Sequence, residues 1–521
     1  MSSLTNSSTQ KYARAIRARA LRTVSRHDMK KQKLGTATSE ATDAPSARPR
    51  PRVTLDSFMT SLAAREIHRR HESNTKAPTL RDAKGLPPCD AYPLTPCLII
   101  DEDAVKFNVN SMFDFTRALN DAEAGHNDAA DDGDRWRPHL KTTKSSRIWS
   151  MLIERGVRRF KVATSLELEV LIRTIRAFTD ARSRSRDCEE IVTYDVLLAY
   201  PLASPAAWTM LAKIFKDTDC SSESGPIRVS VLVDSPDAFR EVPEHMFVFA
   251  DLNLGMNRTG STDIENFIYS CAEYFGERLV GVSMYEGQYA SESSDGIHDT
   301  DHGLMRQTSC DSTYEKFMSA LESAVSRCKS HQSTSKANQA FATSASREFE
   351  VLTSGTPSFV PALKSKHLRK LASMGLTHRV SPGTVVLHDA RGARQNPGMF
   401  QHACFVLATI VSKPTEHLVT CNAGSKSLAC ESGNPAAFVV NHPNWVPMSP
   451  SEEHLPIFIG DYDEWQRVKR GDHILLVPEH ACPTVSMYAK YVVKNTITDG
   501  ERCIQGDIDA RGRHFGFVKR S

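Results

Sequence analysis

The chain alternates short apolar runs with stretches of helical character between residues 95 and 390. Eight such runs end in a polar or small residue: Cys97–Asp101, Arg137–Lys141, Phe160–Thr164, Asp195–Tyr200, Val229–Asp234, Phe247–Asn253, Val280–Tyr285 and Phe349–Ser354. Strands that alternate with helices favour a parallel sheet, and about eight units favour a closed (β/α)8 barrel. We therefore expect an α/β fold with a barrel over residues 90–400.

The segment from Phe160 to Phe178 shows one unit in detail. Thr164 and Glu167 form the Thr-x-x-Glu pattern of a helix capping box directly after a strand. Apolar residues then recur at helical spacing, at Leu168, Leu171, Ile172, Ile175 and Phe178. Thr164 thus marks the carboxyl end of a strand, which is the end that carries the active site in barrels.

The two ends of the chain differ from this pattern. Residues 401–521 read as strands separated by Gly, Pro and Asn turns, which predicts a C-terminal β domain. Residues 1–52 are Ser- and Thr-rich, and the first 27 carry six basic residues and no acidic one. They fit either a disordered basic tail, with the protein in the cytoplasm, or a transit segment to mitochondria or another organelle.

Composition excludes several classes of function. A net charge of +3 on 521 residues gives no argument for nucleic-acid binding. No apolar run approaches the ~20 residues of a membrane span, so no membrane partner is expected. The 12 cysteines form no Cys-x-x-Cys pair, which fits a reducing compartment better than a disulfide framework.

Lys141 and the pair His480 and Cys482 carry the strongest chemical signal. A lysine at a strand's end in a barrel mouth becomes a nucleophile towards an aldehyde when it is shielded from water. If the segment 478–484 is extended, His480 and Cys482 share one face, and imidazole with thiolate suits zinc. The alternatives are an ordinary surface lysine and a chance His-x-Cys.

Three further features lie at predicted strand ends. The turn Ser354-Gly355-Thr356 offers backbone N–H groups to a phosphate, or is simply a tight turn. Arg258 suits a carboxylate or a ring nitrogen, and Tyr285 suits packing against a flat cofactor. The alternatives for these two are a solvated loop arginine and a core tyrosine.

Together these segments resemble the D-serine dehydratase and D-threonine aldolase group. These are pyridoxal-phosphate enzymes with an alanine racemase-type barrel and a C-terminal β domain. The matching segments follow the family order over about residues 90–500, and include Arg137–Lys144, Val162–Thr164, Gly255–Gly260, Tyr285–Gln288, Ser354–Ser358, Asn422–Lys426 and Pro478–Thr484.

The resemblance implies a role for each candidate residue. Lys141 would hold pyridoxal 5'-phosphate covalently. Other cofactor contacts would come from Thr164, Arg258, Tyr285, Ser354, Gly355 and Thr356. His480 and Cys482 would bind zinc, since aldolases of the group tend to have aspartate in place of Cys482. The resemblance also implies a homodimer.

The expected reaction is elimination of water from a D-3-hydroxy amino acid, with D-serine giving pyruvate and ammonia. D-Threonine aldolase-type cleavage is the first alternative, and a catalytically silent pyridoxal-phosphate-binding relative is the second. Thr143 and Val385 stand where the group usually has histidine and tyrosine. These departures bear on the identity of the substrate rather than on the fold.

Overall fold

The computed structural model describes residues 94–124, 135–184, 192–218, 227–289, 300–330, 335–342, 348–494 and 504–514. All of these belong to one compact unit, Leu55–Ser521. The basic segment 1–52 lies outside the described residues. Among the described helices, none is both long enough and apolar enough to cross a membrane.

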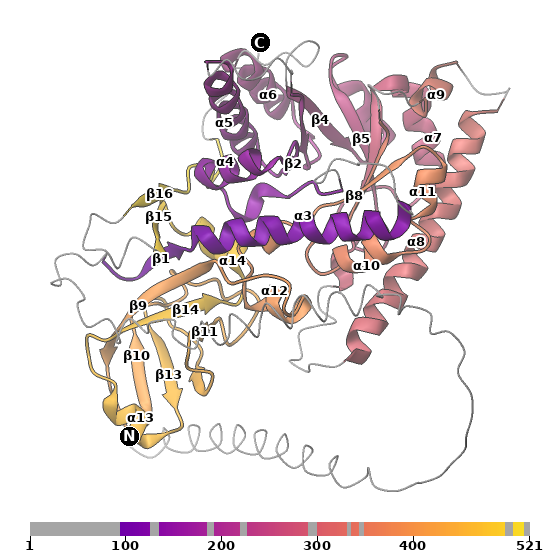
Figure 1. The fold of residues 1–521 in the computed structure, drawn as a ribbon. Coiled ribbons are helices and arrows are strands. Elements are labelled where there is room, and N and C mark those ends of the chain that lie inside the picture. Colours follow the sequence, from indigo (N-terminus) through magenta and orange to yellow (C-terminus); the bar gives the residue numbers. More distant parts are fainter. Residues whose placement is uncertain are drawn as a thin grey trace, which may run out of the picture. The chain divides into compact units, whose positions relative to one another are not determined.

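The first sheet is a closed parallel barrel (Figure 1). Its strands run in the order β2 (Arg159–Val162), β3 (Tyr194–Leu198), β4 (Ile227–Val233), β5 (Phe247–Leu252), β6 (Leu279–Met284), β7 (Glu350–Thr353) and β8 (Thr377–Val380). Residues 136–139 close the ring, because Trp136 pairs in parallel with Val380 of β8 and His139 with Lys161 of β2. The predicted α/β barrel is therefore confirmed.

One of the eight expected barrel strands lies elsewhere. β1 (Cys97–Ile100) pairs antiparallel with β9 (Cys404–Ser412) and parallel with β15 (Lys490–Val493), so its assignment to the barrel was wrong. The missing barrel strand is β8, which reads Thr-His-Arg-Val. Its histidine and arginine are buried, so β8 has no apolar run by which the sequence could reveal it.

The second sheet is mixed and largely C-terminal, as predicted. Its main path is β12-β13-β10-β9-β1-β15-β16, and β14 pairs with β9 and β11. The remaining bounds are β10 (Leu418–Cys421), β11 (Ala437–Val439), β12 (Trp445–Pro447), β13 (Leu455–Ile459), β14 (His473–Pro478) and β16 (Gln505–Asp507). Its own apolar cluster includes Val406, Val419, Ile457 and Leu476.

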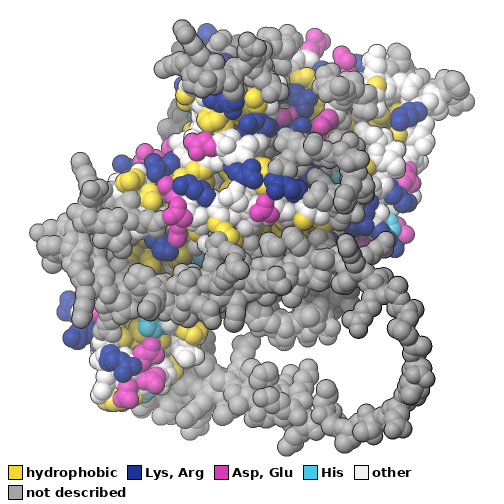
Figure 2. All heavy atoms as spheres, viewed as in Figure 1, with side chains coloured by type: hydrophobic (Ala, Val, Ile, Leu, Met, Phe, Trp, Pro, Cys, Tyr) yellow, Lys and Arg dark blue, Asp and Glu magenta, His cyan; other side chains and the backbone are white. Residues whose placement is uncertain are grey.

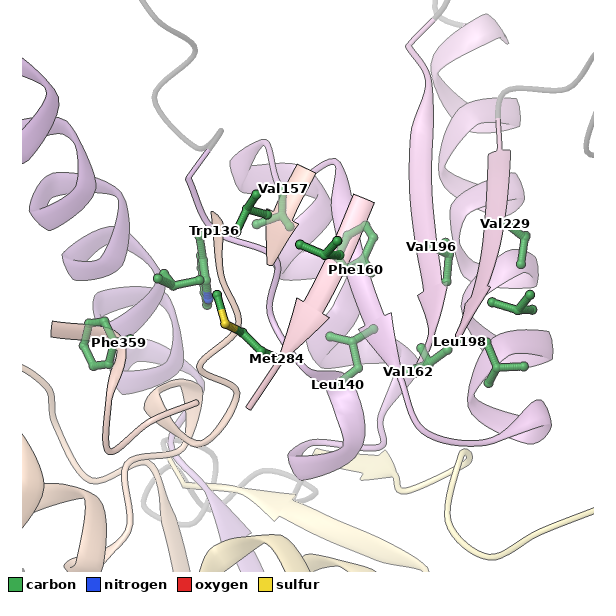
Figure 3. Close-up of a cluster of buried hydrophobic side chains, with 14 of the residues drawn as sticks. Trp136, Leu140, Val157, Phe160, Val162, Val196, Leu198, Val229, Met284 and Phe359 are labelled. Atoms are coloured by element: carbon green, nitrogen blue, oxygen red, sulfur yellow. The ribbon is translucent and has the colours of Figure 1, made fainter. Parts of the chain in front are cut away.

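The longer helices bury their apolar stripes against the strands. Their bounds are α3 (Glu102–Ala124), α4 (Ser146–Arg155), α5 (Ser165–Arg184), α6 (Pro205–Asp217), α7 (Ile264–Phe275), α8 (Thr300–Cys328), α9 (Ser335–Ala340), α10 (Phe359–Lys364), α11 (Lys370–Ser373), α12 (Ala390–Gln395), α13 (Tyr462–Arg467) and α14 (Ala481–Ser486). In α5, Leu168, Leu171, Ile172 and Ile175 are fully buried, as their spacing predicted. Figure 3 shows Phe160 and Val162 of β2 in the same apolar cluster.

The outer face of α3 is charged with both signs. In Figure 2, Lys and Arg side chains alternate with Asp and Glu side chains where α3 crosses the view. Lys106 lies near Asp103 and Arg117 near Asp114, each pair one helical turn apart. The apolar side of α3 is left for the core, where Val105, Val109 and Met112 are buried.

Inside the barrel, a buried ion-pair network lies at the amino-terminal ends of the strands. The Arg137 guanidinium donates to both oxygens of Glu350, at 2.8 and 2.6 Å, and to Asp195 Oδ1 at 2.8 Å. Despite burial, Arg137 and Arg228 hold the pKa of Asp195 well below its usual range. Leu197 follows Asp195 by two residues on β3, and Leu352 follows Glu350 by two residues on β7. Both leucines belong to a small apolar cluster. Side-chain alternation then brings the next inward residues to the carboxyl ends of the strands.

Candidate active site

A cavity opens at the carboxyl ends of the barrel strands and is closed on one side by the second sheet's helix α14. It holds about 1050 Å³ of empty space, part of it open to solvent. Its lining contains all but one of the predicted site residues: Lys141, Arg258, Tyr285, Ser354, Gly355, Thr356, His480 and Cys482. These residues come from strand ends far apart in the sequence, which only the closed barrel brings to one place.

Thr164 is the predicted site residue that does not line the cavity. Its hydroxyl accepts from the Glu167 N–H at 3.0 Å, and the Glu167 carboxylate accepts from the Ala163 N–H at 2.6 Å. This is the capping box expected at the start of α5. The geometry thus gives Thr164 a role in starting the helix and lends no support to its predicted contact with a cofactor.

Lys141 lies in a short 3-10 turn, η2 (Leu140–Thr142), directly after the strand segment 136–139. Its side chain is exposed within the cavity lining, so the expected shielding from water is not found in this chain alone. The second lysine of the motif, Lys144, is buried and pairs with Glu167 instead. Of the two lysines in the motif, only Lys141 is therefore available to a ligand in the cavity.

The turn after β7 lies so close to the Tyr285 ring that there is no space for a side chain at Gly355. A Cβ at Gly355 would lie 2.6 Å from Cε2 of Tyr285, and one at Gly287 would lie 2.4 Å from Cε1. Glycine at both positions lets the Tyr285 ring lie between two backbone segments. The Arg258 guanidinium lies 5.1 Å from the centre of the same ring, within the range of a cation–π contact.

A buried carboxyl group lies behind this turn. The Glu286 side chain is fully buried, and burial raises its pKa to about 7. Ser358 Oγ donates to Glu286 Oε2 at 3.3 Å, and the buried Tyr314 hydroxyl and the Ser354 backbone lie beside the same carboxyl group. Glu286 therefore supports the turn from beneath in a form that is largely protonated below neutral pH.

His480 and Cys482 lie at the start of a helix, not in an extended segment as predicted. β14 ends at Pro478, His480 precedes α14, and Cys482 is in its first turn. Asp389 fixes this turn by accepting from the Ala481 N–H at 2.8 Å. Both side chains still line the same cavity and hydrogen-bond to each other.

His480 and Cys482 shift each other's pKa in opposite directions. Burial opposes the charge on His480, but Cys482, Asp389 and Glu431 together raise its pKa to about 9. Burial likewise opposes the thiolate, but the hydrogen bond from His480 lowers the pKa of Cys482. Thr142 Oγ1 also shares a hydrogen bond with Cys482 Sγ, at 3.0 Å.

The pair supplies two donors suited to zinc and leaves the other positions to be filled. Zinc in proteins takes three or four protein ligands, or fewer with water and substrate in open positions. Within the described residues, no group of three or more His, Cys, Asp and Glu side chains is arranged to hold a metal. The donor chemistry thus fits zinc, whereas the number of protein donors is low.

The sequence reasoning missed four charged residues in the cavity lining: Asp389, Arg391, Lys161 of β2 and Asp251 of β5. Burial lowers the pKa of Lys161 to about 8 and raises that of Asp251. A signal existed for Lys161, because a lysine in the middle of the otherwise apolar run 160–163 must point into the barrel or out to solvent. Nothing in the sequence distinguished these two directions.

Comparison with known proteins agrees with this architecture. Residues 403–494 match the family model described as "Putative serine dehydratase domain". A 3-hydroxy-D-aspartate aldolase of Paracoccus denitrificans (strain Pd 1222) is 23% identical over 83% of this chain and 96% of its own length.

Three solved structures share the fold. D-Threonine aldolase from Filomicrobium marinum aligns with a TM-score of 0.59 and 21% identity, over 81% of this chain and 96% of that chain. An alanine racemase-like protein from Idiomarina loihiensis aligns with a TM-score of 0.55 and 18% identity, over 81% of this chain and 98% of that chain. D-threo-3-Hydroxyaspartate dehydratase from Delftia sp. HT23 aligns with a TM-score of 0.55 and 17% identity, over 82% of this chain and 99% of that chain.

The chain therefore has the alanine racemase-like fold and carries a D-serine dehydratase-like domain. Its relatives are D-threonine and 3-hydroxyaspartate aldolases and dehydratases.

Proposed function

We propose that this protein is a pyridoxal-phosphate- and metal-dependent lyase that acts on a D-3-hydroxy amino acid. The observation that carries the proposal is the single cavity lined by Lys141, by the turn Ser354–Thr356 and by the pair His480 and Cys482. The amine of Lys141 can react with the aldehyde of the cofactor. The small residues around Gly355 can accommodate its phosphate, and the imidazole and thiolate of His480 and Cys482 can bind a metal.

Each group has a chemical task in this proposal. When bound, pyridoxal phosphate supplies an electron sink for a carbanion at the substrate's Cα. Lys141 holds the cofactor and, when its amine is free, removes the α-proton as general base. The hydroxyls of Ser354 and Thr356 and the N–H of Gly355 bind the phosphate. His480 and Cys482 hold a metal whose Lewis acidity acts on the β-hydroxyl.

Dehydration is the first choice of reaction. Hydroxide is a poor leaving group, and a metal held by His480 and Cys482 would supply the Lewis acidity that assists its departure. The cysteine at position 482 supports this choice, because the resemblance associates His-x-Cys with the dehydratases and His-x-Asp with the aldolases.

Aldol cleavage is the second candidate, and a specific observation favours it. A relative that matches 83% of this chain is named 3-hydroxy-D-aspartate aldolase. The fold does not separate the two reactions, because an aldolase and a dehydratase align to this chain with similar TM-scores.

Product analysis tests the proposal. Purified protein is incubated with pyridoxal phosphate and D-serine, D-threonine or D-threo-3-hydroxyaspartate, with the L-enantiomers as controls. Chelator-sensitive release of ammonia with pyruvate, 2-oxobutanoate or oxaloacetate, from the three substrates in turn, supports the dehydratase, and zinc should restore it. Glycine release supports the aldolase instead. If the protein binds the cofactor but forms no product from any D-substrate, the result would support the alternative that it is a catalytically silent relative.

A further inference from the structure

Lys161 is a buried amine that the proposed chemistry does not use. It is the third residue of β2, and its neighbours Phe160 and Val162 pack outward into the main apolar cluster. Because side chains alternate along a strand, Lys161 points into the barrel. It is only 7% exposed, and it lines the floor of the cavity.

The ammonium group of Lys161 lacks acceptors. It carries three N–H donors, and Ser283 Oγ, at 3.4 Å, is its one hydrogen-bond acceptor among the described residues. Asp251 attracts it through space, but no hydrogen bond joins the two side chains among the described residues, and Asp251 Oδ2 accepts from Thr259 Oγ1 at 2.7 Å. A buried amine with unused donors at the wall of a cavity is stabilised when a ligand supplies an acceptor.

The surroundings favour an anionic acceptor. Lys141 and Arg258 line the same cavity, and both, with Arg137 below, disfavour a further positive charge on Lys161. An anion between these groups relieves this repulsion and is attracted by all of them. A neutral ligand would do neither.

We propose that Lys161 forms an anion-binding subsite at the cavity floor, where its ammonium group hydrogen-bonds an anionic oxygen of the bound molecule. Two sources offer this chemistry: the phosphate or phenolate of pyridoxal phosphate, and the second carboxylate of an acidic 3-hydroxy amino acid. Only the naming of these two ligands rests on the proposed function. The turn Ser354–Thr356 is a separate phosphate candidate on β7, which leaves Lys161 of β2 for a second anionic group.

Binding measurements on Lys161→Met and Lys161→Arg test the subsite. Methionine keeps length without charge, and a thermal melt shows whether the variant stays folded without the cation beside Asp251. Lys106→Met is the matched control, because Lys106 is exposed on α3. The apoprotein is titrated with pyridoxal phosphate by absorbance, and the holoprotein with succinate and with butyrate by calorimetry.

Each outcome has a defined meaning. Loss of pyridoxal phosphate affinity by about tenfold or more in Lys161→Met, with partial recovery in Lys161→Arg, assigns the subsite to the cofactor. Unchanged cofactor affinity, with succinate binding reduced to the level of butyrate, assigns it to an acidic substrate. If Lys161→Met binds both pyridoxal phosphate and succinate within about twofold of the wild-type affinity, the proposed subsite is overturned. Wild-type protein that binds these ligands without lyase turnover would overturn only the proposed function.

Discussion

At the scale of single residues, the two cavity lysines differ in their surroundings. Lys141 is exposed in the lining, whereas Lys161 is buried. We expect Lys141 to carry the cofactor, so borohydride reduction of the loaded protein should attach it to the peptide containing Lys141. Lys141→Ala should lose the visible absorbance and the label. Mass spectrometry that finds the label on Lys161 would contradict this assignment.

Cys482 gives a second prediction at this scale. Cys482→Ser should lower zinc content, measured by atomic absorption, and reduce turnover by about tenfold or more, since serine is a much poorer zinc ligand than thiolate. Cys97→Ser is the control, because Cys97 is partly exposed on β1 and does not line the cavity. Equal zinc content in both variants would count against the metal site.

Glu286 predicts a dependence of stability on pH. Its folded pKa, about 7, lies above the ordinary value of 4.5, so the protonated form is the one that burial favours. Its contribution to the free energy of unfolding is therefore present below pH 4.5 and is lost as the pH rises through about 7, by up to about 3 kcal/mol. Urea denaturation at about pH 5 and pH 8 should show this loss in wild type and a smaller one in Glu286→Gln. The same loss in both would contradict it.

At the scale of elements, the turn after β7 depends on the absence of a side chain. Gly355→Ala brings a Cβ within 2.6 Å of the Tyr285 ring, so the ring or the turn must move. We expect pyridoxal phosphate binding to weaken by about tenfold, measured by absorbance titration, with a small effect on stability. Gly460→Ala is the matched control, because its Cβ would meet nothing closer than 3.9 Å. Equal affinity in the two variants would remove the turn from the cofactor site.

At the scale of the whole molecule, the barrel and the second sheet share parts of the chain. β1 precedes the barrel in sequence but pairs with β9 and β15 of the second sheet. A fragment that ends at residue 400 lacks both partners and loses His480 and Cys482. We expect it not to unfold cooperatively by circular dichroism and not to bind the cofactor. A stable fragment with bound cofactor would show that the barrel is an independent domain.

The implied homodimer stays a prediction at this scale, and sedimentation equilibrium of the full chain tests it. The exposure of Lys141 in a single chain makes this measurement relevant, because a second chain over the cavity mouth would shield it. A monomer with full activity would show that the shielding is not needed.

The sequence by itself determined the elements that depend on local pattern. Apolar runs and helical periodicity predicted the barrel strands β2 to β7, the closing segment 136–139 and the apolar stripe on α5. The capping residues Thr164 and Glu167 were also recognisable from the sequence. These features follow from the nearest neighbours of each residue along the chain. The resemblance in turn led to a set of cavity residues that the structure brings together, Thr164 excepted.

Only the tertiary structure decided what depends on distant partners. β1 reads like a barrel strand, yet its hydrogen bonds go to strands some three hundred and some four hundred residues later. β8 reads as polar, yet Arg379 is buried because Glu350 of β7 neutralises it. The sequence leaves Lys161 free to face solvent or the barrel interior, and only the closed barrel shows that it points inward. Burial and pairing are set by which strands meet, and a local pattern does not contain that information.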